Sequence, residues 1–353
     1  MIEIRTFDGN FKEVHKLIRA SWLEDYREKY KQPVIDYSSI DFLEWNLRRP
    51  TIDPDLVLGA YHKGKLVGFV ACLPHTLKYN DQTLKAASSS FFTTHIDYKG
   101  QGIGRLIITT GLLKGMEKGY DINVFVPDEG HLVEKFIEKL SAEIRLRFLK
   151  LHRFTFLTKP LDKNRIKDLA DLPLYQKIAL NIIAPKRTRK SKKSYSFDHK
   201  HDLKIISQML ARQYSQNTLS VVWTEELLLF NLKSEISDTF FLNSRDKGAL
   251  INFYNIDVLG STASQKACMM TMIDNVCFEN MSFYEKHKFV NDFSYDQKDK
   301  GSCLISIPTT PIFDLKPFYS NLYYPSGRYH WFCVHDFNHK LSGPANIGYL
   351  FFR

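Results

Sequence analysis

The chain has 353 residues, a length that fits about two domains of ordinary size. Hydrophobic residues make up 44% and charged residues 25%, which excludes a mainly disordered chain. Lysine and arginine number 49 against 39 acidic residues, so the net charge is +10, and a nucleic acid, an anionic membrane or an anionic ligand could each account for the excess.

Targeting signals and cysteine pairs are not visible in the sequence. The first residues lack a basic stretch followed by an apolar one, and no run approaches the roughly 18 apolar residues of a membrane span. Five cysteines occur without any C-x-x-C pair, so neither a disulfide framework nor a zinc ribbon is expected. We therefore expect a reduced, cytoplasmic protein with no membrane partner.

The first 160 residues alternate strand and helix patterns. Alternating residues at 2–6 predict a strand, and apolar residues at helical spacing then predict a helix. Further strands are predicted at 56–61, 66–79 and 86–96, then a helix ending near Gly119, a strand at 122–127, a helix at 131–144 and a closing strand at 153–159. This order predicts an α/β domain with a mixed sheet over residues 1–160.

Residues 161–200 differ in composition from what precedes them. Pro173 and Pro185 interrupt the pattern, and six of the eight residues in the run KRTRKSKK (186–193) are basic. We interpret this segment as a basic linker that is partly ordered around residues 172–183. A solvated linker explains the basic run, which has no interleaved aromatic residues for stacking on bases.

The second half, residues 201–353, repeats the order of the first. The predicted elements are helices at 202–214 and 224–234, strands at 238–243, 249–260 and 266–278, a helix at 282–293, a strand at 302–308, a short helix at 313–321 and a closing strand at 329–337. This repetition predicts a duplicated α/β fold. In an alternative register, 266–278 is the later strand of the repeat.

A glycine-rich segment stands between the strand at 86–96 and the next helix. Glycines let successive N–H groups turn toward one concavity, and the start of a helix adds partial positive charge. The segment therefore predicts a pyrophosphate site, and it matches neither the P-loop pattern nor a dinucleotide-binding loop after a first strand. Its residues are Lys99, Gly100, Gln101, Gly102, Ile103, Gly104 and Arg105.

The stretch THIDYKGQGIGRLI (94–107) resembles the acyl-coenzyme A loop of the GNAT superfamily of N-acyltransferases, which has the pattern [RQ]-x-x-G-x-[GA] after its fourth strand. Lys99, Gly102 and Gly104 take the first, fourth and sixth positions. The resemblance implies that the backbone of Thr93, Thr94 and His95 hydrogen-bonds the pantetheine arm and that residues 99–105 hold the pyrophosphate. The strand at 122–127 would splay from 91–96 to admit the thioester.

The second half resembles a degenerate copy of the same fold. Phe278-Glu279-Asn280-Met281 stands at the position of the phosphate loop, but it has no glycine, and the carboxylate of Glu279 would repel phosphate. Only the first half is therefore expected to hold coenzyme A. Tandem GNAT proteins with one degenerate half include N-myristoyltransferases, mycothiol synthase-like enzymes and Fem aminoacyltransferases.

Acyl transfer to an amine requires a neutral amine, a stabilised oxyanion and a proton for the leaving thiolate. Backbone N–H groups at 94–96 are candidate oxyanion donors. Asp128 and Glu129, just after the fifth strand, and His95 are candidate acid–base residues, each with a solvated or packed side chain as its alternative. Many GNAT enzymes place a tyrosine acid in the following helix, where this chain has Ile137, so the acid stays open.

Two other groups of residues are weaker candidates for a functional site. Among His330, Cys333, His335 and His339, only Cys333 and His335 share a strand face, so no metal is expected. Tyr254 and Asp257 are further candidates for the cleft between the halves.

The sequence thus predicts two GNAT-like domains in tandem that move an acyl group from acetyl-CoA, or another acyl-CoA, to a small-molecule or peptide amine bound between them. N-acetyl transfer is the main expectation, without a metal or a specific nucleic acid. The alternatives are a longer-chain acyl or aminoacyl transferase of the same architecture and a non-catalytic acyl-CoA-binding regulatory protein.

Overall fold

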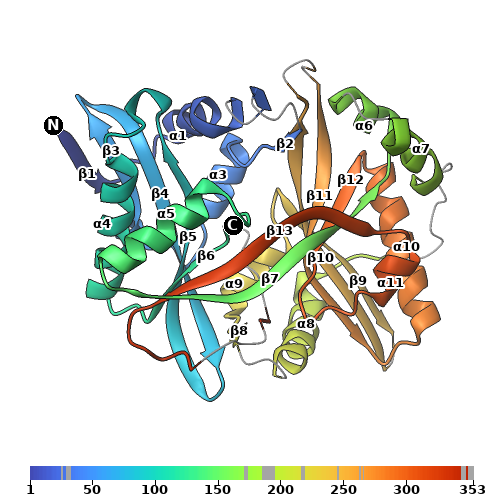
Figure 1. Cartoon of the computed structure of the whole chain (residues 1–353). Helices are drawn as coiled ribbons and strands as arrows, with labels where there is room; N and C mark the ends of the chain where they lie inside the picture. The colour runs from blue at the N-terminus through green and yellow to red at the C-terminus, as the bar shows by residue number, and fades with distance from the viewer. Residues whose placement is uncertain are drawn as a thin grey trace.

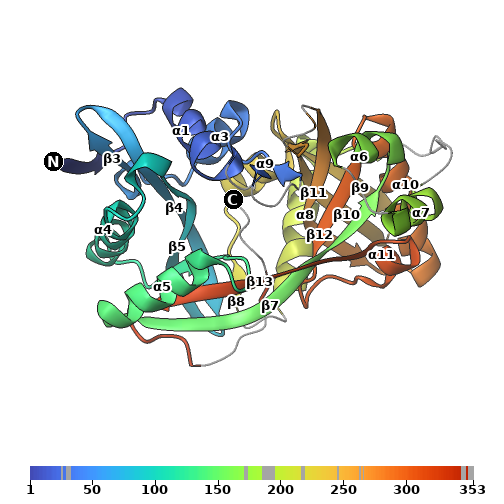
Figure 2. The same cartoon turned by 45° about the horizontal axis from the view of Figure 1, so that its top comes forward.

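The computed structural model describes residues 1–24, 27–28, 33–170, 174–184, 195–215, 219–244, 246–261, 264, 266–342 and 347–348. Its strands form one thirteen-stranded mixed sheet, with helices packed on it in both halves (Figures 1 and 2). The predicted α/β class with a mixed sheet is confirmed. The basic run at 186–193 lies outside the described residues.

The first half contains every strand and helix that the sequence predicts there. Two elements, β2 and α3, are additional. The elements are β1 (Ile2–Thr6), α1 (Phe11–Ile18), β2 (Val34–Ile35), α3 (Ile40–Leu47), β3 (Val57–His62), β4 (Lys65–Tyr79), β5 (Gln82–Thr94), α4 (Ile103–Glu117), β6 (Ile122–Phe125), α5 (Leu132–Glu143) and β7 (Arg147–Pro160).

Two helices, α6 (Lys163–Leu169) and α7 (Leu174–Ile183), lie in the predicted linker. The second half then repeats the order of the first, with β11 at the position of β5, so the main register is confirmed and the alternative is wrong. Its elements are α8 (His199–Tyr214), β8 (Leu219–Val221), α9 (Glu225–Leu232), β9 (Ser237–Ser244), β10 (Lys247–Leu259), β11 (Ala267–Glu279), α10 (Phe283–Asp299), β12 (Leu304–Pro308), α11 (Lys316–Ser320) and β13 (Tyr324–Asp336).

The two halves exchange their closing strands. β7 of the first half pairs antiparallel with β12 of the second, and β13 of the second half pairs antiparallel with β6 of the first. β7 and β13 also pair with each other, so the middle of the sheet has the order β5-β6-β13-β7-β12-β11 (Figure 1). The division into residues 1–160 and 201–353 therefore describes a repeated order of elements whose sheet is shared across the boundary.

Two short strands repeat this exchange. β2, between the first two helices of the first half, pairs with the end of β10, and β8, at the same place in the second half, pairs with the end of β4. Trp45 of α3 and Phe230 of α9 occupy equivalent positions in WNL and FNL, and their rings stack at 5.8 Å. Equivalent residues meet in this way only near a two-fold axis, so the halves are related by an approximate two-fold rotation.

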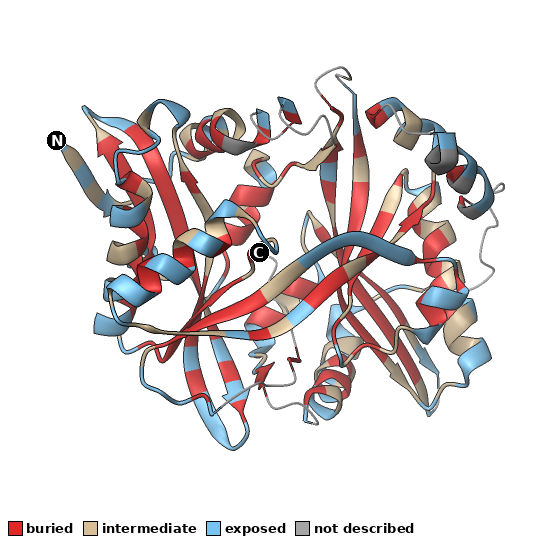
Figure 3. Ribbon diagram, viewed as in Figure 1, coloured by how far each residue is buried: buried red, intermediate tan, exposed pale blue. Residues whose placement is uncertain are grey.

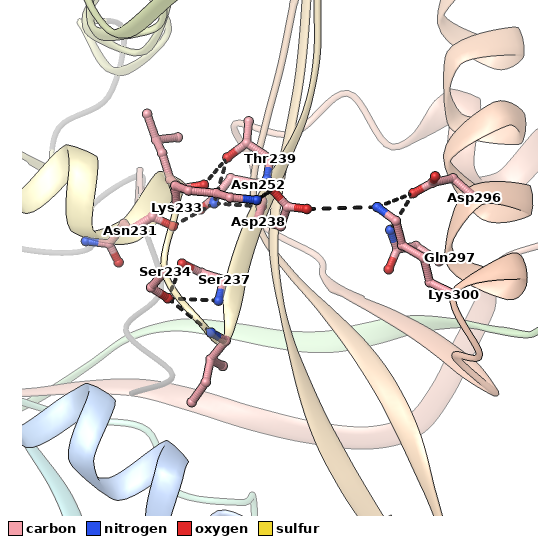
Figure 4. A network of polar contacts seen from close by, with 12 residues as sticks. Asn231, Lys233, Ser234, Ser237, Asp238, Thr239, Asn252, Asp296, Gln297 and Lys300 are labelled. Atoms are coloured by element: carbon pink, nitrogen blue, oxygen red, sulfur yellow. Dashed lines mark hydrogen bonds and ion pairs between the residues drawn. The ribbon is translucent and has the colours of Figure 1, made fainter. Parts of the chain in front are cut away.

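A polar network fixes α9 against the sheet of the second half (Figure 4). The Asn252 side chain on β10 donates to the carbonyl of Asn231 at 2.8 Å, and the Thr239 hydroxyl donates to the carbonyl of Leu232 at 2.6 Å. Asn252 is fully buried, and leaving such a group unpaired costs about 1–3 kcal/mol. The satisfied network therefore holds one orientation of the helix.

One hydrophobic cluster joins both halves beneath the exchanged strands, where Figure 3 shows the buried part of β13. Phe332 and Val334 of β13 pack in this cluster with Ile122 and Val124 of β6. Phe332 and Val334, which belong to the second half of the sequence, thus stabilise the core of the first half.

Cys268 and Cys303 form a disulfide, so the expectation of unpaired cysteines is wrong. Met270 and Leu304 are partners in the parallel pair of β11 and β12, and each cysteine lies one or two residues before its partnered residue. This proximity arises from the sheet and leaves no spacing signal in the sequence. The remaining thiols are buried and free: Cys72, Cys277 and Cys333.

His335 is a neutral histidine in the hydrophobic core. Its fully buried ring contacts Phe125 and Phe148, and Nε2 shares a hydrogen bond with the hydroxyl of Ser141. Burial lowers the pKa of His335 to about 4. In the described part of the chain, no group of three or more histidine, cysteine, aspartate or glutamate side chains has the arrangement of a metal site. Nor does that part contain a helix long and apolar enough to span a membrane.

Phe332→Ala should lower the free energy of unfolding by about 3–5 kcal/mol, because it opens a cavity in the cluster that both halves share. Phe283→Ala is the matched control, since Phe283 on α10 is 54% exposed and should cost about 0.5 kcal/mol or less. Urea unfolding followed by circular dichroism measures both variants, and equal shifts would contradict the shared core.

Acidification should destabilise the protein through His335. The unfolded histidine takes up a proton near pH 6.5 and the folded one only near pH 4, so stability falls as the pH decreases through this window, by about 3 kcal/mol at most. His335→Gln should flatten this dependence in urea unfolding at several pH values. His201→Gln on the surface of α8 should not, and an unchanged dependence in His335→Gln would refute the assignment.

Candidate functional site

The glycine-rich loop has the backbone that the sequence predicts for an anion site. Gly100 and Gly102 have φ values of 79° and 77°, in the left-handed region that favours glycine, and no atom lies within 4 Å of a Cβ added at either position. Gly102 is the N-terminal cap of α4, whose first N–H groups have no partner within the helix. An anion could approach this helix end without meeting a side chain.

Gly104 serves packing rather than conformation. A Cβ at this position would lie 3.1 Å from the Phe92 ring and 3.3 Å from the Thr94 hydroxyl. The missing side chain therefore lets the first turn of α4 rest directly on β5.

The positive charges around the loop are only partly available to a bound anion. Lys99 is exposed, and the guanidinium of Arg105 is 57% exposed but lies 3.0 Å from the carboxylate of Glu143 on α5. The side chain of Gln101 donates to the carbonyl of Asp97, which fixes the turn before the helix. An anion at the loop would compete with Glu143 for Arg105.

β5 contains a bulge directly before the loop. Phe69 pairs with Thr93 and Ala71 with Ser90, so Phe91 and Phe92 together oppose the single residue between them on β4. Phe91 has a φ of 57°, in the left-handed region. A bulge leaves backbone groups outside the ladder, so this is where β5 offers hydrogen-bonding groups.

β5 and β6 separate at the same level. They pair in parallel only from Ala86–Ile122 to Ser88–Val124, although β5 continues to Thr94. The side chains of Ser89 and Asn123 hydrogen-bond at 2.9 Å where the strands part. The predicted splay is present.

His95 has other partners than the sequence suggests. Its N–H donates to Val67, and its carbonyl accepts from Tyr98. Its Nδ1 accepts a hydrogen bond from the N–H of Asp97 and so caps the short helix Ile96–Tyr98. The N–H of His95 is thus engaged within the protein and is not free to donate to the pantetheine arm or an oxyanion, whereas its carbonyl can accept a second hydrogen bond.

Glu129 is held in an ion pair. Its two carboxylate oxygens accept from Nε and Nη2 of Arg153, both at 2.7 Å. The hydrogen bond from Arg153 is the main reason why the pKa of Glu129 lies below its ordinary value. A carboxylate paired in this way is a weak base.

Asp128 lies beside a histidine that the sequence does not single out as an acid–base residue. Its Oδ1 is 2.9 Å from Nδ1 of His330 on β13. Burial alone would raise the pKa of the Asp128 carboxyl, but the hydrogen bond and charge of His330, with His131 and Arg328, hold it below its ordinary value. Only the exchange of closing strands brings His330 here.

The three predicted acid–base residues do not form one cluster. Asp128 and Glu129 are adjacent on the chain that extends β6, and their side chains point to different partners. Among the residues described, no hydrogen bond or ion pair joins His95 to either of them.

The two further candidates lie elsewhere. Tyr254 is buried against Phe42 and Trp45, and Asp257 lies where β10 meets β2.

The counterpart of the loop in the second half is closed to phosphate. Glu279 pairs with Arg212 at 2.7 and 2.8 Å, and Ser282 with Glu285 forms a capping box at the start of α10. A cavity of about 440 Å³ lies next to it, lined by residues of α8, β11 and the segment 311–314 and by Lys286 of α10. Gln213 bridges this cavity by donating to the carbonyls of Val276 and Ile312.

Residues 2–110 match the family model of the N-terminal domain of myristoyl-CoA:protein N-myristoyltransferase. A glycylpeptide N-tetradecanoyltransferase of Drosophila melanogaster is 29% identical over 102 residues, which are 28% of this chain and 21% of that protein. The matched stretch is thus a small part of the curated relative.

Solved structures extend the likeness to the whole chain. The crystal structure of Saccharomyces cerevisiae N-myristoyltransferase with bound myristoyl-CoA has a TM-score of 0.76 at 15% identity, covering 99% of this chain and 89% of that one. A GCN5-related N-acetyltransferase from Anabaena variabilis has a TM-score of 0.52 at 10% identity, covering 94% of this chain and 72% of that one. The predicted tandem of two GNAT-like halves is therefore confirmed, and the chain has the fold of the N-myristoyltransferase structures.

Proposed function

We propose that the chain is an acyl-CoA-dependent N-acyltransferase that moves a long-chain acyl group of the myristoyl type to the amine of a glycine-initiated peptide. The match of residues 2–110 to the N-myristoyltransferase model carries the proposal, because this stretch contains both the bulge and the glycine loop. The comparisons give no support to the main expectation of N-acetyl transfer and favour the long-chain alternative.

The loop is the proposed site for the pyrophosphate of the acyl-CoA. The N–H groups at the start of α4 and the exposed Lys99 and Arg105 supply partial and full positive charge. Gly100 and Gly102 leave the approach free of side chains. The same N–H groups in the second half are capped by Ser282 and Glu285, so one cofactor site per chain is proposed.

The opening between β5 and β6 is the proposed place of the thioester. Backbone N–H groups freed by the bulge at Phe91 and Phe92 would stabilise the oxyanion, a contribution of about 3–4 kcal/mol for one donor in other acyl-transfer enzymes. Phe91 also packs against two apolar clusters, one from α1, α3 and β4 and one that includes Tyr254 and Met272. The side chains of these clusters are apolar, which is the chemistry that a hydrocarbon chain would need from an adjoining site.

The acceptor is proposed to enter along β13. Residues 324–329 of this strand are exposed, as Figure 3 shows, and they directly precede His330, which bridges to Asp128 after β6. Relatives from Drosophila melanogaster and Caenorhabditis elegans are named for a glycylpeptide substrate, and an extended peptide fits a strand surface with exposed side chains. Of the three predicted acid–base residues, we retain only Asp128 as a candidate for the acyl-transfer reaction.

Acyl-chain preference tests the proposal directly. Release of free coenzyme A thiol from acyl-CoAs of two to sixteen carbons, with a glycine-initiated octapeptide, should be fastest near fourteen carbons. The same peptide with an acetylated N-terminus should give no release, because it lacks a free amine. A maximum at acetyl-CoA would restore N-acetyl transfer, and tight binding of every ester without release would support the non-catalytic alternative.

Gly102→Glu should weaken the binding of myristoyl-CoA at least about tenfold in calorimetry, because it places a carboxylate at the pyrophosphate site and strains a left-handed residue. Gly64→Glu is the matched control: Gly64 has a φ of 78°, has no atom within 4 Å of an added Cβ, and lies in the turn between β3 and β4. Equal affinity of the two variants would remove the loop from the cofactor site.

A further inference from the structure

We propose that α7 docks the protein on an anionic membrane surface. An exposed apolar stripe of this helix would lie in the membrane interface, and the basic residues that follow it in sequence would face the lipid head groups. Such docking is independent of the proposed acyl transfer. It changes the interpretation of the basic segment, which the sequence presents as a solvated linker, and the expectation of no membrane partner.

α7 presents a straight row of aliphatic side chains to the outside of the protein. Leu174, Ile178 and Ile182 follow one another at intervals of four residues, a spacing that places side chains on one helix face. They are 75%, 52% and 72% exposed. Leu180 and Ala184 are buried and mark the face by which the helix packs on the protein. The exposed row, which we call the α7 stripe, is therefore not used in that packing.

The position of α7 leaves the stripe accessible to a large partner. Both views place α6 and α7 at the outer edge of the second half (Figures 1 and 2). An exposed apolar patch on a protein commonly marks a surface that contacts another protein or a membrane. The charge of the surrounding chain decides between these partners.

The chain around the α7 stripe carries only positive charge. Residues 172–197 include seven lysine and arginine residues and no aspartate or glutamate. Six of the seven belong to the basic run at 186–193, which begins three residues after the end of α7. Basic residues are attracted to an anionic bilayer only within about 10 Å of its surface, so charge next to an apolar helix face is the arrangement that such docking needs.

Other partners match only one of the two features. A nucleic acid would attract the basic run, but aliphatic side chains give its bases no aromatic surface for stacking. A second copy of this chain could cover the α7 stripe, but it would bring the same positive charge to the contact. An anionic bilayer supplies hydrocarbon for the stripe and negative head groups for the lysines and arginines.

Sedimentation of the full chain with lipid vesicles tests the docking. Phosphatidylcholine vesicles with about 30% phosphatidylserine should bind the protein at least about tenfold more tightly than phosphatidylcholine alone, and about 0.5 M NaCl should remove most of this difference. Ile178→Ser combined with Ile182→Ser should weaken binding to the anionic vesicles about tenfold, because the apolar face is lost while the charge is unchanged. The melting temperature should stay the same, since both side chains are exposed.

Matched controls separate the α7 stripe from other exposed residues. Leu113→Ser combined with Met116→Ser removes apolar side chains of α4 that are 50% and 38% exposed, and it should leave vesicle binding unchanged. For the charge, Lys192→Gln combined with Lys193→Gln should weaken binding to anionic vesicles and lower its salt dependence. The same changes at two exposed lysines of the β3–β4 hairpin, Lys63 and Lys65, should have no effect.

A thiol label measures insertion directly. The free cysteines among the described residues are buried, so Ile182→Cys offers an exposed thiol for an environment-sensitive fluorophore. Its emission should shift to shorter wavelength when anionic vesicles are added, because the label enters an apolar environment. The same label at Leu113→Cys should show no shift.

Two kinds of result would overturn the docking. One is equal binding to neutral and anionic vesicles, or no binding. The other is anionic binding that survives the two serine substitutions with no shift at residue 182, which would mean attraction by charge alone. Binding of an RNA or DNA oligonucleotide without binding of vesicles would assign the basic run to a nucleic acid instead. None of these outcomes bears on the acyl transfer, which is measured with soluble acyl-CoA and peptide.

Discussion

The antiparallel pairing of β7 with β13 is the constraint on which the rest of the structure depends. Because these strands cross between the halves, β6 has a neighbour from the second half and β12 a neighbour from the first. Strand pairing buries backbone groups that would otherwise be unsatisfied. Neither half therefore completes its sheet alone, and the two repeats act as one structural unit.

The same exchange brings together chemistry that is distant in sequence. β13 runs beside the extension of β6 and places His330 against Asp128. The splay of β5 and β6, the bulge and the glycine loop all belong to the first half. The proposed site is thus built from the binding elements of one repeat and a strand of the other.

The approximate two-fold symmetry also shows how the repeats diverged. The loop of the first half carries glycines in left-handed conformations, whereas its counterpart carries Glu279 and the capping pair of Ser282 and Glu285. In the second half, Gln213 crosses the cavity between β11 and residues 311–314. The start of α4 in the first half has no side-chain cap, whereas the start of α10 in the second half is capped by Ser282 and Glu285. We therefore propose the cofactor site in the first half alone.

The sequence by itself determined most of the order of elements, the duplication and the glycine loop, because periodicity and glycine positions are local signals. The splay was implied by the resemblance to the GNAT superfamily. It did not determine the pairing of β7 and β13, the strands β2 and β8, the disulfide of Cys268 and Cys303, or the contact of His330 with Asp128. Each of these joins residues that are far apart in the chain, and a strand pattern does not specify its partner. The sequence predicted which residues could take part in chemistry, while the tertiary structure decided which of them are in contact.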